Sequence, residues 1–175
     1  YSEDSFTPSD FDLTPYVKEG ENKLAVQVFK WTSSSWCEDQ DFFRFSGIFR
    51  SVYLYMIPKT HLCDIKIRPQ VAESLSGGTL ELDLRSCGSG NVRIQLVERG
   101  RLDLAESRYE TSEGTEVFAL EEKMDGTLHV SREVADVKLW SVEEPYLYEL
   151  RMEVYDAAGN LQEVVASKIG FRRFE

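Results

Sequence analysis

Histidine and cysteine are scarce in this 175-residue sequence, which holds two histidines and three cysteines. His61 and His129 have no second histidine or cysteine at a metal-ligand spacing, so the sequence gives no support for a zinc site. Cys37, Cys63 and Cys87 are odd in number and far apart in the sequence, which predicts neither a disulfide framework nor a CxxC metal motif. A reducing cytoplasm is therefore the expected compartment.

Long apolar runs and an excess of positive charge are also missing. No stretch approaches the roughly 18 consecutive apolar residues that a membrane-spanning helix needs, and the first residues lack the basic-then-apolar layout of a signal peptide. The net charge is −11, from 20 basic and 31 acidic residues, so the surface should repel phosphate. These absences argue against a membrane or a nucleic acid as partner. With 42% hydrophobic residues, a folded and soluble protein is expected.

Local catalytic motifs are absent as well. The sequence has no GxSxG elbow, no P-loop and no GxGxxG, and the glycine cluster at 88–90 is interpreted as a turn. The acidic pairs at 121–122 and 143–144 are adjacent residues, which face opposite ways on a strand and so cannot flank one glycosidic bond. On local chemistry alone, the chain is predicted to be a binding or scaffolding segment.

Aromatic residues are abundant in the first third of the chain, where 13 of the 21 lie within residues 1–59. Two runs there, 24–29 and 52–57, alternate with a period of two residues, which predicts strands. Both faces of these runs are apolar or aromatic, so we expect them to lie between two layers of a sandwich. A change of character near Pro58 indicates the meeting of two regions.

After residue 61, strand patterns recur about every 8–12 residues, which is typical of a sandwich or barrel. In 79–85 three leucines alternate with charged residues, which predicts one buried and one solvent-exposed face. Turns are predicted at the glycine-containing segments 77–78, 88–90 and 158–160, and no helix is predicted. The expected strands are 64–71, 79–85, 92–99, 116–120, 126–130, 146–155 and 161–169.

Two sets of longer motifs carry a family resemblance. GENKLAVQVFKW at 20–31, followed by EDQDFFRFSGIFRSVYLY at 38–55, resembles the N-terminal sugar-binding domain of the β-galactosidases of glycoside hydrolase family 2. KLWSVEEPYLYELRMEVYD at 138–156 and the closing KIGFRRFE resemble the end of the immunoglobulin-like domain that precedes the catalytic barrel in that family. The resemblance covers the whole chain, although residues 72–136 match only in pattern. The EDQD run favours the β-galactosidase branch over the β-glucuronidase and β-mannosidase branches.

The resemblance implies an all-β chain with two domains. Residues 1–59 would be the C-terminal part of a jelly-roll, galactose-binding-like sugar domain, and residues 60–175 would be an immunoglobulin-like β-sandwich. The chain would stop where the catalytic barrel starts, so the paired glutamates of a retaining glycosidase would lie outside it. The whole enzyme is expected to hydrolyse terminal non-reducing β-D-galactosides such as lactose, whereas this fragment alone is expected to be inactive.

One acidic residue matches a site of the family. Asp41, the second aspartate of the run Asp39-Gln40-Asp41, aligns with the sugar-domain carboxylate that binds sodium and the galactose C6 hydroxyl in that family. An ionised carboxylate offers acceptor-only oxygens, which suit a hydroxyl donor and a hard cation. The resemblance therefore implies a galactoside substrate, with sodium and magnesium as cofactors of the whole enzyme and at most a sodium ligand in this chain. It also implies a homo-oligomer and the catalytic barrel as partners.

Residues near Asp41 have alternative interpretations. Arg44 and Arg50 could hold carboxylates such as Asp39, and this structural role is preferred. Trp36 and Phe42 could stack on a sugar ring, although packing within the sandwich or against the catalytic barrel is the preferred interpretation. Core and corner positions of the second sandwich are predicted for Trp140, Pro145, Tyr146 and Tyr148.

Two further questions have alternatives. Residues 107–122, from Ser107 to Glu122, have turn chemistry at their centre. They are either an ordinary exposed hairpin or a loop that crosses a subunit interface, as in tetrameric members of the family. The chain as a whole is either part of a longer enzyme or a free-standing carbohydrate-binding or adhesion module. The leading segment enters halfway through a jelly roll, which favours the longer enzyme.

Overall fold

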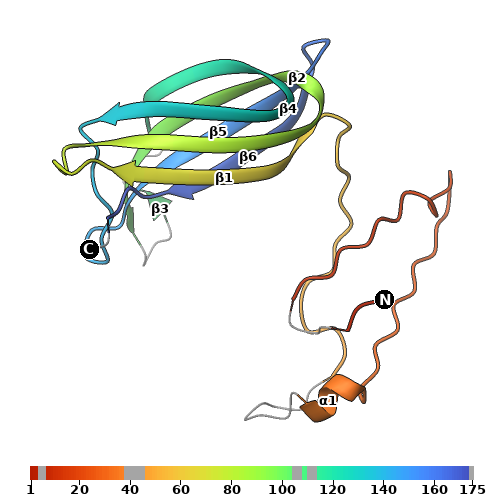
Figure 1. Cartoon of the computed structure of the whole chain (residues 1–175). Helices are drawn as coiled ribbons and strands as arrows, with labels where there is room; N and C mark the ends of the chain where they lie inside the picture. Colours follow the sequence, from red (N-terminus) through yellow and green to blue (C-terminus); the bar gives the residue numbers. More distant parts are fainter. Residues whose placement is uncertain (4–6, 38–45, 104–107, 110–113, 174–175) are drawn as a thin grey trace. The chain divides into compact units, whose positions relative to one another are not determined.

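The structure is a computed structural model that describes residues 1–3, 7–37, 46–103, 108–109 and 114–173. The chain divides into two compact units, residues 1–55 and residues 56–175, and each is described by itself (Figure 1). Within the described ranges, no helix is long and apolar enough to cross a membrane.

The second unit is a curled antiparallel sheet that contains six strands among the described residues (Figure 1). The hydrogen-bonded order is β1-β2-β5-β6, and β3 and β4 also pair with β2. The strands are β1 (His61–Val71), β2 (Gly77–Asp103), β3 (Arg108–Tyr109), β4 (Thr115–Ala135), β5 (Tyr146–Asp156) and β6 (Leu161–Ile169). The expected all-β class is confirmed.

The long strands β2 and β4 change partners part of the way along. Up to Cys87, β2 pairs with β1 and with the later part of β4. From Ser89 onward, β2 pairs with the earlier part of β4 and with β5. Between these stretches the register shifts, and Gly88 and Gly126 have φ values of 80° and 88°. Glycine adopts this conformation without a Cβ penalty, so the strand pair bends over its own core instead of ending.

This bend corrects the sequence-based prediction for the middle of the unit. The glycine cluster at 88–90 lies within β2 and is not a turn, so the strands expected at 79–85 and 92–99 form one strand. In the same way, β4 joins the two strands expected at 116–120 and 126–130. Glycine permits positive φ in bulges as well as in turns, and only the pairing partners distinguish the two.

The hairpin turns at the two outer connections can be compared with their predictions. The turn expected at 158–160 is present between β5 and β6. The backbone N–H groups of its three residues donate hydrogen bonds to Asp156. The turn between β1 and β2 instead lies at 72–76, where Leu75 has a φ of 60°. The glycines at 77–78 begin β2, so the prediction of a turn at those two residues is wrong by a few positions.

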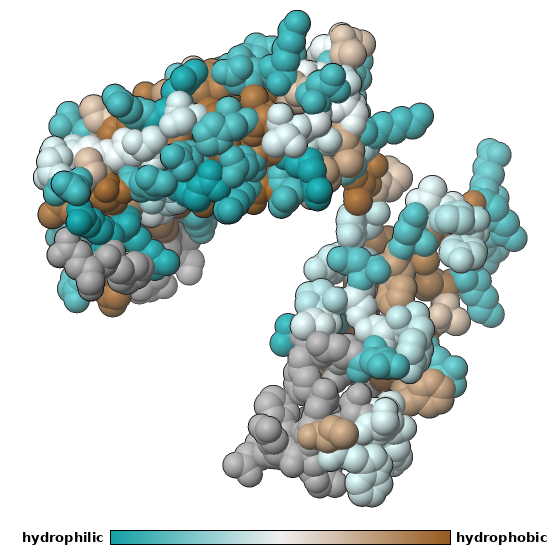
Figure 2. Space-filling model, viewed as in Figure 1, coloured by the Kyte–Doolittle hydropathy of each residue, from teal (hydrophilic) through white to brown (hydrophobic). Residues whose placement is uncertain are grey.

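The core is built from alternating apolar residues of β2, β4 and β5. Leu80, Leu82 and Leu84 are at most 1% exposed, whereas Glu81 and Asp83 lie on the other face of the strand. This confirms the predicted one-sided burial. On the face of this unit that Figure 2 shows, many hydrophilic residues lie among hydrophobic ones. Each fully buried leucine contributes about 1.5–3 kcal/mol. The other buried hydrophobic residues are Leu62, Val92, Ile94, Leu96, Met124, Val130, Val134, Val137, Tyr148, Leu150, Met152, Val154, Ile169 and Phe171.

The segment that follows β6 closes one end of this core. Phe171 is fully buried and packs edge-on against Tyr148, with ring centroids 5.3 Å apart. The Phe171 carbonyl accepts a hydrogen bond from the Trp140 amide at 2.8 Å. Gly170 permits this approach, since a Cβ there would lie 2.9 Å from the Trp140 side chain. Pro145 and Tyr148 are buried and Trp140 is half-buried, in agreement with their predicted core and corner positions.

The first unit differs from its sequence-based prediction. Its described residues contain one short helix, α1 (Ser33–Cys37), and no strand. The runs at 24–29 and 52–57 are not strands and are exposed to solvent; Val26 is 59% and Leu54 is 74% exposed. Figure 2 shows hydrophobic residues on the surface of this unit. The prediction that these runs are strands between two layers is therefore wrong for this structure.

The physical reason is the lack of partners. A strand that is apolar on both faces needs a hydrogen-bonded neighbour on each edge and a packed layer on each face. Two such strands without covering layers are at best marginally stable in water. The described residues of the first unit supply no neighbouring strand and no covering layer.

Candidate functional site

The residues predicted to bind sugar cluster in one segment of the first unit. Asp41 falls within 38–45, outside the described residues, as do Asp39, Phe42 and Arg44. The structure therefore places neither the predicted ligand of sugar and sodium nor the predicted clamp by Arg44. These assignments stay predictions.

The described flanks of this segment are exposed. On its N-terminal side, Trp36 lies in α1 and is 80% exposed. On its C-terminal side, Gly47 has a φ of 99°, and the Arg50 guanidinium carbon lies 5.8 Å from the centroid of the Phe49 ring. An exposed indole is available for stacking on a sugar ring. Packing of Trp36 within the sandwich is not observed among the described residues, and packing against the catalytic barrel stays a prediction.

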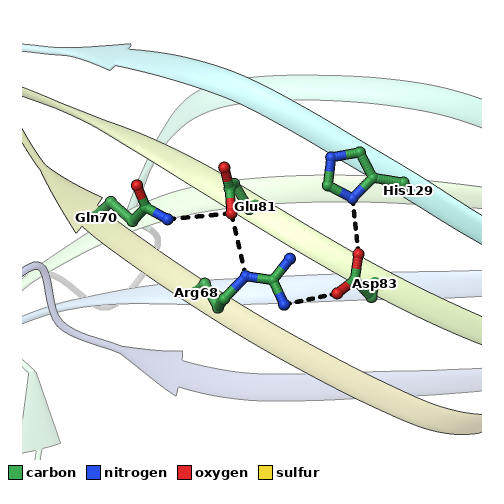
Figure 3. A network of polar contacts seen from close by, with 5 residues as sticks. All are labelled: Arg68, Gln70, Glu81, Asp83 and His129. Atoms are coloured by element: carbon green, nitrogen blue, oxygen red, sulfur yellow. Dashed lines mark hydrogen bonds and ion pairs between the residues drawn. The ribbon is translucent and has the colours of Figure 1, made fainter.

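A network of polar side chains crosses β1, β2 and β4 on the outer face of the second unit (Figure 3). Arg68 donates from Nη1 to Asp83 Oδ2 at 2.6 Å and from Nε to Glu81 Oε2 at 3.1 Å. Gln70 Nε2 donates to the same Glu81 oxygen at 3.1 Å, and His129 Nδ1 lies 2.7 Å from Asp83 Oδ1. Arg68 is opposite Glu81 and His129 is opposite Asp83 in the register. The network therefore joins three neighbouring strands.

This network keeps Asp83 ionised. Hydrogen bonds from Arg68 and then from His129 lower the pKa of the Asp83 carboxyl from 3.8 to about 2. The same contact with Asp83, followed by that with Glu81, raises the pKa of Arg68. At neutral pH Asp83 is charged and both of its oxygens accept contacts, so it is unsuited to donate a proton as a glycosidase acid does. The arrangement is that of a cross-strand brace.

A second polar cluster joins β2 to the segment that precedes β5. Lys138 Nζ donates to Glu98 Oε1 at 2.7 Å and to the Tyr146 hydroxyl at 3.0 Å, and that hydroxyl donates to Glu98 Oε1. The hydrogen bond from Lys138, and then that from Tyr146, lowers the pKa of Glu98. The Tyr148 hydroxyl accepts a hydrogen bond from the Lys138 amide at 3.0 Å. These contacts hold the corner between β4 and β5 in place.

The pKa directions of the carboxyl groups also bear on catalysis. Asp12, Asp83, Glu98 and Asp156 have lowered pKa values, because each accepts hydrogen bonds from backbone or side-chain donors. The acid of a glycosidase instead needs a raised pKa. In the described part of the chain, the carboxyl groups with lowered pKa values therefore form ion pairs or accept hydrogen bonds within turns.

The described residues can also be tested for a metal site. They contain no group of three or more His, Cys, Asp or Glu side chains that could hold a metal ion. His61 Nδ1 lies 2.7 Å from the Pro58 carbonyl oxygen, and His129 contacts Asp83, so both histidines have structural contacts. Asp41, the predicted sodium ligand, lies outside the described residues, and the sodium and magnesium that the family resemblance implies stay predictions.

The candidate interface loop at 107–122 is described only in part. Its β3 strand pairs with the end of β2, and its residues from Thr115 onward belong to β4. Gly114 has a φ of 72°, and a Cβ there would lie 2.6 Å from Val97 Cγ1. Residue 107 and residues 110–113 lie outside the described ranges. The choice between an exposed hairpin and a subunit-interface loop stays a prediction.

Sequence reasoning did not indicate two features of the second unit. The first is the Arg68 network. The alternation of charged Glu81 and Asp83 with leucines indicates an outer face, but it does not identify the residues of β1 and β4 that contact them. The second is the closeness of Cys63 and Cys87 in the register of β1 and β2, where Cys87 is opposite His61. Both features depend on strand register, which no local pattern reveals.

Comparison with known proteins covers both units. The family model described as "Glycosyl hydrolases family 2, sugar binding domain" matches residues 1–58, and the one described as "Glycosyl hydrolases family 2" matches residues 60–172. Over its whole length, the chain is 47% identical to a beta-galactosidase of Halalkalibacterium halodurans and 46% identical to one of Clostridium acetobutylicum. It is 44% identical to the beta-galactosidase large subunit of Lactobacillus helveticus. The chain spans 16%, 18% and 26% of these relatives, respectively.

Solved structures add a likeness of fold. The apo structure of Bacteroides uniformis beta-glucuronidase 3 matches 78% of this chain and 16% of that chain, with a TM-score of 0.63 and 23% identity. At this identity the likeness bears on the fold alone. The family assignment comes from the two sequence models, which together match residues 1–58 and 60–172. The chain belongs to glycoside hydrolase family 2.

Proposed function

We propose that this chain is the sugar-binding and scaffolding portion of a β-galactosidase that hydrolyses terminal non-reducing β-D-galactosides with retention of configuration. The observation that carries the proposal is the identity of 44–47% over the whole chain to relatives named beta-galactosidase. The chain spans 16–26% of those relatives, so the catalytic carboxylates are proposed to belong to a barrel outside it. A homo-oligomeric enzyme in the cytoplasm stays part of this proposal.

Within this chain, Asp41 is the residue proposed to contact the substrate. Its ionised carboxylate would accept a hydrogen bond from the galactose C6 hydroxyl and would serve as a ligand for sodium. The exposed indole of Trp36 supports the proposal, because it offers an aromatic face close to Asp41 in the sequence. Magnesium is proposed for the whole enzyme and not for this chain.

The second unit is proposed to act as the scaffold. Asp83 and Glu98 are ionised by contacts with Arg68 and Lys138, and these contacts join strands or hold a corner. Because both carboxylates accept these contacts, they add rigidity to the unit and neither of the two is available as a proton donor. This matches a role in support of a site that lies elsewhere in the enzyme.

The test of the Asp41 assignment uses the whole enzyme. Asp41→Asn removes the negative charge but keeps the shape of the side chain, and Asp39→Asn makes the same change two residues away. A charge-assisted hydrogen bond is worth about 1.5–3 kcal/mol, so Asp41→Asn should lower kcat/KM by about tenfold or more. It should also weaken activation by sodium, whereas Asp39→Asn should change both much less. Unaltered kinetics across a sodium titration in a folded Asp41→Asn enzyme would remove Asp41 from the site.

The test of the division of labour uses the chain alone. The purified 175-residue chain should not hydrolyse a chromogenic β-galactoside, whereas the whole enzyme should do so. Turnover by the chain above the buffer background would contradict the proposal. Galactoside binding by the chain, combined with no hydrolysis by the whole protein, would instead favour a free-standing carbohydrate-binding or adhesion module.

A further inference from the structure

Two exposed cysteines lie close in the register at the start of the second unit. Cys63 lies in β1 and Cys87 lies in the adjacent strand β2, and both are exposed to solvent. The Cys63 thiol donates a hydrogen bond to the Arg85 carbonyl oxygen at 3.3 Å, and Arg85 lies two residues before Cys87 in β2. Cys87 is opposite His61, which lies two residues before Cys63 in β1, so the two cysteines are close in the register although 24 positions separate them in the sequence.

The backbone at both cysteines departs from a regular ladder. The register shifts between Leu62 and Asp64, so Cys63 is the extra residue of a bulge in β1. Cys87 directly precedes Gly88, which has a φ of 80°. A Cβ at Gly88 would lie 2.8 Å from Thr60 Oγ1, so the chain that enters β1 packs closely against this bend. Both cysteines therefore lie at irregular points of adjacent strands, in diagonal positions of the register.

We propose that Cys63 and Cys87 form a reversible disulfide by exchange with a low-molecular-weight disulfide such as glutathione disulfide. The thiolate of one cysteine attacks one glutathione sulfur, the bond between the two glutathione sulfurs breaks, and one glutathione leaves as a thiol after it takes a proton. The thiolate of the other cysteine then attacks the cysteine sulfur of this mixed disulfide, which forms the Cys63–Cys87 bond and releases the second glutathione. The two cysteines lose two protons and two electrons, and the glutathione disulfide becomes two glutathione thiols.

The interaction with Cys63 is the largest cause of the raised pKa of Cys87, which agrees with the closeness of the two residues in the register. The bridge would tie the first residues of β1 to the bend of β2.

The experiment uses the chain with Cys37→Ser, so that the only thiols are Cys63 and Cys87. After treatment with glutathione disulfide, the native chain should lose two hydrogen masses, and a cross-linked peptide should contain both cysteines. Ring closure should be about tenfold or more faster in the native chain than in the same chain unfolded in urea, because folding holds the thiols together. The oxidised chain should unfold at a temperature about 5 °C higher than the reduced chain.

The matched controls are Cys37→Ser with Cys63→Ser, and Cys37→Ser with Cys87→Ser. Each should stop at a mixed disulfide with one glutathione. The proposal would be overturned if the two-thiol chain, folded by circular dichroism, gained two glutathiones or formed disulfides only between chains. Closure that is no faster in the native chain than in urea would also overturn it. The two-thiol chain gives a result even if a control variant fails to fold.

Discussion

The two units of this chain use hydrophobic residues in opposite ways. Residues 1–59 hold 13 of the 21 aromatic residues, yet the large hydrophobic side chains of this region are mostly exposed. Among the described residues, all exposed large hydrophobic side chains lie in the first unit, residues 1–55, except Met56, Ile57, Leu75, Val142, Leu161 and Val164. The second unit buries its leucines, valines and methionines between paired strands. The content of apolar residues therefore does not decide which unit forms a core.

The difference comes from strand pairing. In the second unit β2 pairs with β1, β3, β4 and β5, so its backbone groups are bonded and its apolar face meets other apolar faces. The first unit has no strand among its described residues, and its apolar runs contact water. An apolar strand gains its burial free energy only when a neighbouring strand and a facing layer are both in place.

The largest expected difference between the units is in hydrogen exchange. Backbone amides of 148–154 in β5 should exchange about ten-thousand-fold more slowly than unstructured amides, because they open only with the whole sheet. Amides of 24–29 should exchange with little protection, since no ladder includes them. Exchange followed by mass spectrometry measures both segments in one sample. Equal protection of both segments in a monomeric sample would break the comparison.

The next effect is a matched pair of leucine truncations. Leu150 is fully buried in β5, and Leu54 is 74% exposed. Leu150→Ala should lower the free energy of unfolding of the second unit by about 2–5 kcal/mol, through lost burial and a residual cavity. Leu54→Ala should change it by no more than about 0.5 kcal/mol. Urea unfolding followed by circular dichroism measures both, and a large loss for Leu54→Ala would show that the first unit packs in solution.

The smallest effect concerns the polar surface of the second unit. The pKa of Asp83 is about 2 in the folded chain and 3.8 as its ordinary value. A lowered pKa in the folded state stabilises that state above about pH 4, and this contribution is lost as the pH falls toward 2. The Asp83 side chain is 38% exposed, so solvent screening keeps the effect small. Urea midpoints should therefore fall less between pH 5 and pH 2 in Asp83→Asn than in the unchanged chain.

Arg68→Gln sharpens this last test, because Arg68 is the largest cause of the lowered pKa of Asp83. It should also reduce the acid sensitivity of the second unit, by raising the pKa of Asp83 toward its ordinary value. If both variants keep the full acid sensitivity of the unchanged chain, the network in Figure 3 does not contribute to stability.

Local patterns predicted the second unit well where one strand can be recognised by itself. The strand expected at 146–155 is observed as β5 (Tyr146–Asp156), and the one expected at 161–169 is observed as β6. The one-sided burial of Leu80, Leu82 and Leu84 also follows from alternation. These features need no knowledge of partners, because the side-chain period of a strand is a property of the strand alone.

Predictions that depend on partners were less successful. Residues 88–90 lie within β2, beside a register shift, and are not a turn, and the runs at 24–29 and 52–57 are not strands. The local signals were real: glycine does adopt positive φ at 88, and the runs are apolar on both faces. What these signals could not specify is which other segment lies beside them. The candidate site shows the same limit, since Asp41 was found by resemblance and lies outside the described residues.

The sequence by itself determined the all-β class, the family and the alternation that separates core from surface in the second unit. These depend on composition and on contacts between residues close in the chain. Only the tertiary structure decided that β2 and β4 continue through their glycine bends, that Arg68 reaches Asp83, and that Cys63 and Cys87 lie close in the register of adjacent strands. Each of these depends on the register between strands, and register is set by the packing of the whole sheet, which no short segment contains.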